Sequence, residues 1–335
     1  MTDDAVPTAG DRIGLAGSNV AIPPLGVGTW AWGDKGTWGM GGYDTAFSEE
    51  TIRTAWEASI AAGVVLFDTA EIYGAGESER IIGRLLARDP VVRERVVIAS
   101  KFMPTPWKLA VTQALVTSAK KSIERMGIDS VDLYQIHGPV SLRSHEAIAE
   151  ALATAQAAGL VKAVGVSNYS VKETRAIDAA LRKRGLRLAT NQIEYSLLRT
   201  MPDRVGLLEC CRQLGVVPLA YSPIGQGRLT GKYSAANPPP GKRTFSAHPM
   251  EKVDAVVRQL RTIGAAHGDR TPSQVALAYI IAKGVVPIPG AKNRAQAEEN
   301  AGALGWRMEE AELAALDAAA LYGRRTVTSR FFQHG

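Results

Sequence analysis

The sequence is poor in cysteine, and what little it has is arranged unfavourably for cross-linking. Only two of its 335 residues are cysteines, and these two, Cys210 and Cys211, are adjacent. Neighbours in sequence rarely reach disulfide geometry with each other. They lie in a segment with helical spacing, 207–215, so we expect two small helix residues. The five histidines are scattered without cysteine company, and the sequence therefore predicts no metal site.

Long apolar runs and targeting segments are also missing. No stretch of eighteen or more apolar residues occurs, so the sequence predicts no membrane-spanning helix. The first twelve residues, MTDDAVPTAGDR, are polar and acidic. They lack the apolar centre of a secretory signal and the Arg- and Ser-rich character of a transit peptide. We therefore expect a cytoplasmic protein whose residues 1–11 are flexible.

Strong charge is absent as well. The formal net charge is +6, with basic residues in short groups at 181–184 and 292–294. No aromatic residues alternate with them and no recognition-helix pattern appears, so we do not expect nucleic-acid binding. A solvated surface together with a site for an anionic cofactor accounts for the excess of positive charge.

The sequence does contain a short β-rich run followed by a longer segment of helical spacing, repeated eight times. Ser18 and Asn19, between two apolar runs, predict a preceding β-hairpin. The strands are expected at 24–30, 64–70, 95–102, 131–137, 162–168, 189–196, 216–223 and 285–290. Most are continuous apolar runs, typical of strands buried on both faces of a parallel sheet. The chain is thus predicted to be a single α/β domain over 1–335, a (β/α)8 TIM barrel with extra helices.

A doubly wound open sheet is the competing architecture, and its fingerprint is G-x-G-x-x-G after the first strand. Gly26 and Gly28 lack a glycine three residues further on, and after Gly74 and Gly76 that position holds Glu79. Neither segment matches.

Helix boundaries are marked by capping residues. Ser48 is expected to cap a helix at 51–63, and Thr271, followed by Pro272, is expected to begin a later one. Several helices should end at a glycine: Gly63, Gly127, Gly159, Gly185, Gly215 and Gly284.

Two segments exceed the repeating pattern. The stretch 225–250 is rich in Gly and Pro, and a long irregular loop inside a compact domain usually has a function, often as a lid. Residues 251–267 are expected to form an inserted helix. The stretch 322–335 has no clear period, and its Phe331 and Phe332 either pack over a pocket or dock the tail.

Polar residues gather at the carboxyl ends of successive predicted strands, where barrels of this type carry their active sites. Asp68, Lys101 and His137 end strands two to four, and Tyr73 follows Asp68. A carbonyl that accepts a hydride needs a proton on its oxygen, and a phenol is a poor donor near neutral pH unless a nearby ammonium lowers its pKa. A carboxylate keeps that ammonium charged, and an imidazole can orient the carbonyl. Each residue alone also has a purely structural explanation, as an ion pair or a buried histidine.

The segment 67–74, FDTAEIYG, resembles the signature of the aldo-keto reductase family around its catalytic Asp and Tyr. The segments GESER at 76–80, IASK at 98–101, DLYQIH at 132–137, VGVSN at 164–168, AYSP at 220–223 and IPG at 288–290 follow in the family's order. The resemblance runs from about residue 12 to about residue 320, and in combination these motifs are highly specific. Within the family, the sequence resembles plastid-type and pyridoxal-reductase-like members in particular.

The resemblance implies four catalytic roles. Tyr73 would be the general acid/base and Lys101 would tune its pKa. Asp68 would pair with Lys101, and His137 would position the carbonyl. The alternatives are a non-catalytic nicotinamide-binding regulator resembling channel β subunits, and a lyase that forms a Schiff base at Lys101. The partner would be a small carbonyl compound, and both a monomer and a homo-oligomer remain open.

The resemblance also implies an NADP(H) site. Ser167, Asn168 and Gln192 would hold the nicotinamide carboxamide, and Tyr221 would stack on the ring. The loop 222–229, with Ser222, Gly225 and Leu229, would hold the pyrophosphate. The adenosine part would be held around the start of the last predicted helix, by Gly290, Lys292, Arg294, Gln296, Glu299 and Asn300. An anion at a helix N-terminus is stabilised by free N–H groups. Lys292 and Arg294 favour a 2′-phosphate, hence NADP over NAD.

The sequence departs from the family at two positions. Gly138 follows the histidine where many members carry a bulky residue or an Asp, which opens the pocket beside the carbonyl. Gly290 stands where some members have a lysine. The resemblance makes pyridoxal a candidate substrate, and the candidate pocket walls are Trp30, Trp32, Phe102, Trp107 and Tyr134.

Overall fold

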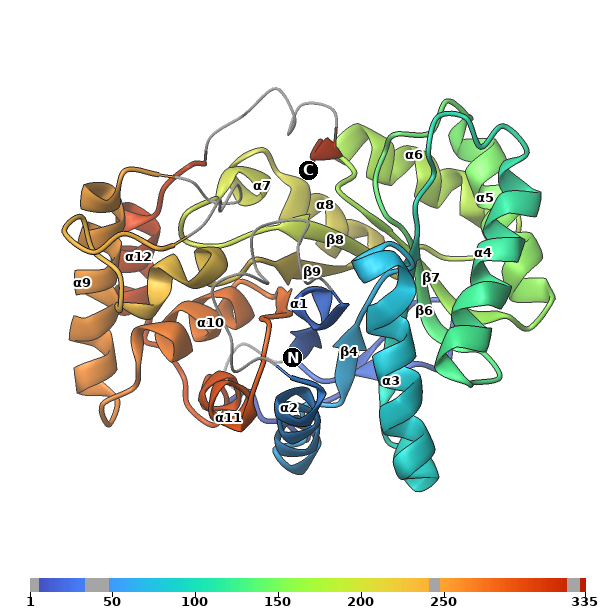
Figure 1. Ribbon diagram of the computed structural model, residues 1–335. Helices are drawn as coiled ribbons and strands as arrows, with labels where there is room; N and C mark the ends of the chain where they lie inside the picture. Colours follow the sequence, from blue (N-terminus) through green and yellow to red (C-terminus); the bar gives the residue numbers. More distant parts are fainter. Residues whose placement is uncertain (1–5, 34–47, 241–247, 324–331) are drawn as a thin grey trace.

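A computed structural model describes residues 6–33, 48–240, 248–323 and 332–335. Eight parallel strands form a nearly closed barrel with helices around it (Figure 1). The strands pair in the order β10-β9-β8-β7-β6-β5-β4-β3, and a bridge between Gly28 and Gly290 joins the two ends of the sheet. Their bounds are β3 Gly26–Gly28, β4 Leu66–Asp68, β5 Val97–Phe102, β6 Val131–Ile136, β7 Val161–Ser167, β8 Thr190–Glu194, β9 Val217–Tyr221 and β10 Val286–Pro287. The predicted TIM barrel is confirmed.

The predicted N-terminal hairpin is present and closes one end of the barrel. Its strands, β1 Ile13–Gly14 and β2 Ala21–Ile22, pair antiparallel. Leu15 and Ile22 pack with Leu66 and Leu133 in an apolar cluster inside the barrel. The opposite end of the barrel, at the carboxyl ends of the parallel strands, carries the polar side chains of the candidate site.

The helices begin and end largely where the sequence predicts. Ser48 Oγ accepts from Thr51 N at the start of α2, and Thr271 Oγ1 accepts from Gln274 N at the start of α10. The six glycines expected to end helices all have φ between +63° and +78°, the left-handed conformation typical of that position. The α-helices are α1 Trp30–Gly33, α2 Glu49–Ala61, α3 Glu77–Arg88, α4 Val111–Met126, α5 His145–Ala157, α6 Val171–Arg182, α7 Met201–Arg204, α8 Leu207–Leu214, α9 Met250–Ala266, α10 Pro272–Ala282, α11 Arg294–Ala301 and α12 Glu310–Ala319, and the short 3-10 turns are η1 Tyr73–Gly76, η2 Pro90–Glu94 and η3 Gly225–Thr230.

Some predicted boundaries were wrong. The first and last barrel strands are shorter than expected, because prolines such as Pro24 and Pro289 cannot donate to a strand ladder. The segment 225–250 is not irregular throughout, since it opens with η3. Its residues 241–247 lie outside the described residues, as does Phe331. The inserted helix expected at 251–267 is α9, one residue earlier at each end.

Cys210 and Cys211 both lie on α8, where they are buried and not cross-linked. Within the described ranges, no group of three or more His, Cys, Asp or Glu side chains is arranged to hold a metal ion. In the same part of the chain, no helix combines the length and apolarity needed to span a bilayer.

Candidate active site

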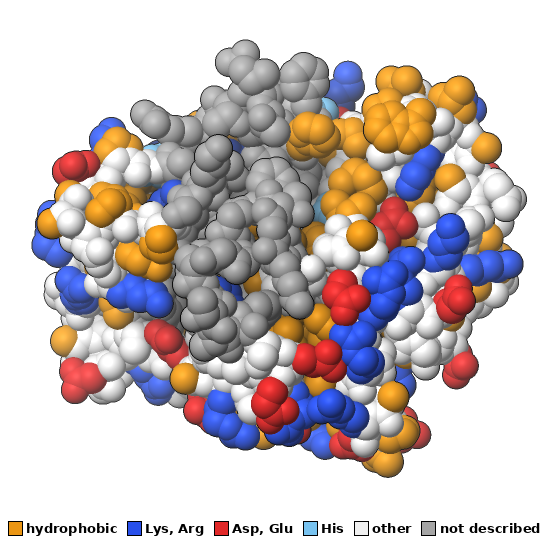
Figure 2. Space-filling view, viewed as in Figure 1, with side chains coloured by type: hydrophobic (Ala, Val, Ile, Leu, Met, Phe, Trp, Pro, Cys, Tyr) orange, Lys and Arg blue, Asp and Glu red, His pale blue; other side chains and the backbone are white. Residues whose placement is uncertain are grey.

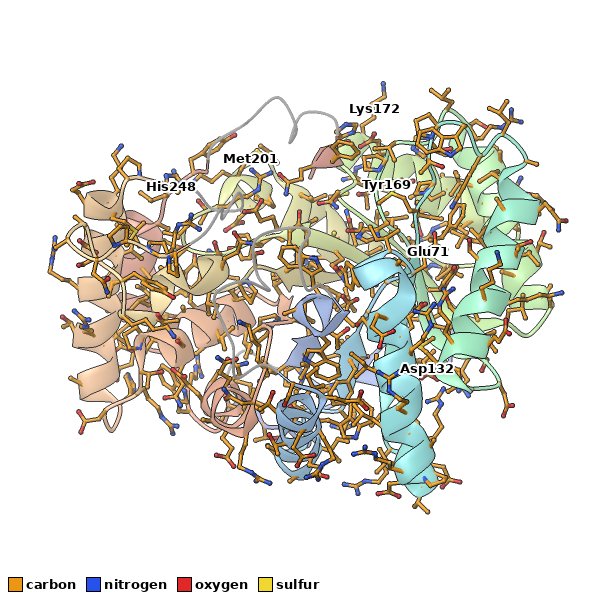
Figure 3. The ribbon with its side chains drawn as sticks, in the orientation of Figure 1. Glu71, Asp132, Tyr169, Lys172, Met201 and His248 are labelled. Atoms are coloured by element: carbon orange, nitrogen blue, oxygen red, sulfur yellow. The ribbon has the colours of Figure 1, made fainter. Side chains whose placement is uncertain are left out.

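The four predicted catalytic residues meet at the carboxyl end of the barrel. Lys101 Nζ lies 2.5 Å from Asp68 Oδ2, 2.9 Å from the Thr69 carbonyl and 3.2 Å from the Tyr73 hydroxyl. The rings of Tyr73 and His137 meet edge to face, with centroids 5.7 Å apart. Figure 3 labels Glu71, which follows β4, and, lower in the view, Asp132, the second residue of β6.

The hydrogen bonds of Lys101 determine where the hydroxyl proton of Tyr73 can point. An ammonium has three N–H groups and accepts nothing, and the three contacts of Lys101 use all of them. The Tyr73 oxygen therefore accepts from Lys101, and its own proton points elsewhere. Asp68 and Lys101 are buried, whereas Tyr73 and His137 are partly exposed. A substrate can thus reach the phenol and the imidazole while the ion pair behind them stays dry.

Local backbone geometry holds Tyr73 in place. It begins the turn η1, five residues after the end of β4 at Asp68, and Gly74 follows with φ +58°. A Cβ at Gly74 would lie 1.9 Å from the Gly33 carbonyl oxygen, so only glycine allows η1 to pack this closely on α1. Glu71 supports the same turn by accepting from Met103 N at 2.8 Å.

Two buried amides complete the surroundings of Asp68. Its Oδ1 accepts from Gln192 Nε2 at 2.8 Å and from Gln135 Nε2 at 3.2 Å, and Thr190 Oγ1 donates to Gln135 Oε1 at 3.3 Å. Gln135 was not predicted from the sequence. A signal was present, because this amide lies two residues after the inward-facing Leu133 and so on the same face of β6.

The charges in the cluster shift the pKa values in definite directions. Burial lowers the pKa of Lys101, but the Asp68 carboxylate and the Tyr73 oxygen outweigh it and the net pKa is raised. Burial raises the pKa of Tyr73 above 10, and the Lys101 ammonium opposes this only in part. Lys101 thus lowers the pKa of Tyr73, as expected, while desolvation of the phenolate raises it and is the larger of the two effects.

His137 is neutral in this setting. Burial, followed by the Lys101 charge, holds its pKa well below 6.5. Its Nδ1 is buried, and no partner for it occurs among the described residues. A neutral imidazole beside Tyr73 can donate one hydrogen bond to a carbonyl oxygen.

The residues expected at the nicotinamide lie next to this cluster. Asn168 Nδ2 donates to Ser167 Oγ at 3.0 Å, and the Tyr221 hydroxyl donates to Asn168 Oδ1 at 2.9 Å. Ser167 Oγ donates to the Gln192 carbonyl at 2.8 Å. The structure thus brings these four residues together, with Gln192 also bonded to Asp68.

The loop after β9 has the backbone shape of an anion site. Ser222, Gly225, Gln226 and Gly227 all have positive φ, between +51° and +88°. Backbone in such conformations forms concave nests of N–H groups that bind phosphate. Arg228 is buried at the same loop and donates to the Gly225 carbonyl at 3.3 Å, while Leu229 is fully buried. A buried guanidinium beside such a loop fits a pyrophosphate.

The predicted adenosine and 2′-phosphate residues surround the start of α11. Asn293 caps this helix by accepting from Gln296 N, and Gln296 Oε1 accepts from Lys292 N at 2.9 Å. The other members of the set are engaged as follows: Asn300 Nδ2 donates to Gly290 O at 3.2 Å, Glu299 Oε1 accepts from Thr271 Oγ1 at 3.1 Å, and Arg294 pairs with Glu298 at 3.3 Å. Lys292 is half-buried and Arg294 exposed, so the two cations differ in setting.

Three of the five candidate pocket walls are core residues. Trp32, Phe102 and Tyr134 are at most 1% exposed, and Trp32 Nε1 donates to the Ala291 carbonyl at 2.8 Å. They cannot line an open pocket, so that expectation is wrong for them. The sequence did not separate them from Trp107, which is 77% exposed, because residue type alone does not show how deeply an aromatic side chain is buried.

Comparison with known proteins identifies the family of this chain. The model of the aldo/keto reductase family matches residues 24–321. The chloroplastic pyridoxal reductase of Arabidopsis thaliana is 34% identical over 327 residues, which cover 94% of this chain and 87% of that protein. A thermostable aldo-keto reductase crystallised with the inhibitor epalrestat superimposes with a TM-score of 0.73 at 30% identity, covering 92% of this chain and 100% of that one.

A second solved structure is the aldo/keto reductase of Klebsiella pneumoniae in complex with NADP and acetate. It has a TM-score of 0.71 and 26% identity, covering 93% of this chain and 95% of that one. With a family model over most of its length and a relative above 30% identity, this chain belongs to the aldo/keto reductase family.

Proposed function

We propose that this chain reduces the carbonyl group of an aldehyde or ketone, with Tyr73 as the proton donor. The chain is an enzyme of the aldo-keto reductase family, and NADP(H) is its cofactor. NADPH supplies the hydride when bound. The observation that carries the proposal is the hydrogen-bonded chain from Asp68 through Lys101 to Tyr73, with His137 at its exposed end.

The residues perform the proton transfer as follows. Tyr73 is protonated at neutral pH because its pKa is raised, and its proton is not used in the bond to Lys101. As negative charge develops on the carbonyl oxygen, Tyr73 gives up that proton. Lys101, 3.2 Å away, stabilises the phenolate that remains, and neutral His137 donates a hydrogen bond to the same oxygen. The Gln135 and Gln192 amides hold Asp68 behind the ion pair.

The pairing of Lys101 with Asp68 and Tyr73 argues against a Schiff-base lyase. Such chemistry needs a neutral amine, whereas the pKa of Lys101 is raised and its three N–H groups are engaged. A non-catalytic nicotinamide-binding regulator is distinguished by its lack of turnover.

The test follows NADPH absorbance with purified protein and three carbonyl compounds, 4-nitrobenzaldehyde, methylglyoxal and pyridoxal. We expect turnover with at least one of them. Quenching of protein fluorescence by NADPH without any reduction would favour the regulator.

The rim of the barrel favours apolar or aromatic aldehydes. Ile72, Trp107, Leu109 and Leu142 are large exposed apolar residues, and they follow β4, β5 and β6. Figure 2 shows hydrophobic side chains gathered at the upper right of this face. Since a relative is a pyridoxal reductase, we propose pyridoxal and other aromatic aldehydes as the substrate class.

The pH profile of reduction should have no descending limb near neutrality. Reduction requires protonated Tyr73, whose pKa is raised above 10, and neutral His137, whose pKa is well below 6.5. We therefore expect kcat/KM for reduction to stay level from about pH 6 to about pH 9 and to fall only beyond about pH 10. Initial rates in buffers of constant ionic strength check this. A descending limb centred between pH 7 and 8 would mean that the Lys101 ammonium lowers the pKa of Tyr73 by more than burial raises it.

Cofactor choice should depend more on Lys292 than on Arg294. Lys292 is half-buried before α11, whereas Arg294 is exposed at the start of that helix. We expect Lys292→Ala to raise the Kd of NADPH about tenfold, the size expected for a charge-assisted hydrogen bond, and to leave that of NADH unchanged. Fluorescence titration with both cofactors measures this, with Arg294→Ala as the matched variant of smaller effect. Equal losses for NADPH and NADH would contradict a 2′-phosphate role.

A further inference from the structure

The C-terminal segment 332–335 lies on residues of the nicotinamide end. The backbone N–H groups of His334 and Gly335 both donate to the Asn168 carbonyl, at 3.0 and 3.1 Å. Gln333 Nε2 lies 2.6 Å from the Tyr221 hydroxyl and 2.9 Å from Glu194 Oε2. The chain end accordingly lies over the rim of the barrel, near β8 and α8 (Figure 1).

The direction of these hydrogen bonds follows from the groups involved. A carboxylate only accepts, so Gln333 turns its NH2 group toward Glu194. The same nitrogen donates to the Tyr221 oxygen, and this leaves the Tyr221 proton for Asn168 Oδ1 at 2.9 Å. Asn168 Nδ2 in turn donates to Ser167 Oγ at 3.0 Å. One continuous chain of hydrogen bonds therefore links the tail to Asn168 and Ser167, two of the three side chains that would hold the carboxamide.

The tail is firmly anchored around Gln333. His334 Nδ1 lies 2.8 Å from Glu173 Oε1, and Arg199 Nη2 donates to the Gly335 carbonyl at 3.0 Å. Gly335 is buried so closely that a Cβ would lie 2.8 Å from the Tyr169 carbonyl oxygen. These contacts hold the Gln333 amide at a fixed position over Tyr221.

Gly138, which follows His137, lies beside the tail. A Cβ there would have the Phe332 carbonyl oxygen as its nearest neighbour, at 3.8 Å, an ordinary contact distance. The tail thus borders the space next to Gly138.

We propose that Gln333 is a positioning residue of the cofactor site, which acts through Tyr221 and Asn168 to orient the nicotinamide. Tyr221 is half-buried with its hydroxyl engaged, so a ring face can stack on the cofactor while the tail fixes the ring's rotation. The inference rests on the proposed function, because it takes Tyr221 and Asn168 as nicotinamide residues.

The test compares two ligands on the full chain. NADPH contains the nicotinamide, whereas 2′,5′-ADP has only the adenosine half. We expect Gln333→Leu to raise the Kd of NADPH about three- to tenfold, as for loss of one or two hydrogen bonds, and to leave the Kd of 2′,5′-ADP unchanged. Gln333→Lys keeps a donor for Glu194 and Tyr221 and should restore most of the affinity. Gln213→Leu, an exposed glutamine on α8, is the matched control.

Other outcomes would overturn the inference. Equal weakening of both ligands would mean a general disturbance of the fold. A higher KM for the carbonyl compound with an unchanged Kd of NADPH would assign the tail to the substrate pocket alone. If the unmodified protein binds and uses NADPH while Gln333→Leu behaves identically, only the role of Gln333 fails. If the unmodified protein does not bind NADPH, the proposed function fails with it.

Discussion

Replacing Tyr73 by phenylalanine should lower kcat for carbonyl reduction by about 10²- to 10⁴-fold, the usual contribution of a positioned general acid. The reason is specific to one atom, because the Tyr73 hydroxyl is the group that Lys101 contacts at 3.2 Å and whose proton remains free. The ring itself stays, so its edge-to-face contact with His137 is preserved. Steady-state assays with NADPH and 4-nitrobenzaldehyde measure the loss.

Cofactor binding should survive this change. The Kd of NADPH for Tyr73→Phe is expected within about twofold of the unmodified protein, since one lost hydroxyl contact outside the nicotinamide set changes binding little. Tyr322→Phe, an exposed tyrosine far along the chain, controls for removal of a phenol oxygen as such. Full activity in Tyr73→Phe would refute the proton-donor role even though the family assignment stands.

The fold could be predicted because each local signal is short-range. Most of the eight β-rich runs are continuously apolar, and a cap such as Ser48 acts on a backbone N–H three residues away. Glycines such as Gly127 end helices through their own φ. The ends of the strands were harder to predict. A proline removes a hydrogen bond to the neighbouring strand, and the sequence does not show which residue of that strand is its partner.

The meeting of Asp68, Tyr73, Lys101 and His137 could also be predicted, since the barrel topology brings strand ends together wherever they lie in the chain. The surroundings of Asp68 could not, because Gln135 reaches it from β6 and Gln192 from β8. The direction of the Tyr73 pKa depends on how deeply the phenol is buried, which only the assembled structure gives. The tail contacts of Gln333 join residues more than a hundred positions apart, with no local pattern to indicate them.

Removing the buried ammonium should separate stability from catalysis. Lys101→Met leaves the Asp68 carboxylate, itself only 2% exposed, without its counter-charge. Breaking a buried ion pair on one side destabilises a protein by about 3–5 kcal/mol. We expect a loss of that size in the free energy of unfolding, measured by urea denaturation. We also expect kcat to fall about 10²-fold or more, because the phenolate loses its stabilising charge.

The double variant Lys101→Met/Asp68→Asn distinguishes the two effects. Asparagine keeps one oxygen for the Gln135 and Gln192 amides but carries no charge, so most of the lost stability should return while kcat stays low. Lys172→Met, an exposed lysine on α6, should change neither property. If the double variant also regained activity, the ammonium would serve only to neutralise Asp68. If it stays inactive but stable, Lys101 acts on Tyr73 directly, as the 3.2 Å contact indicates.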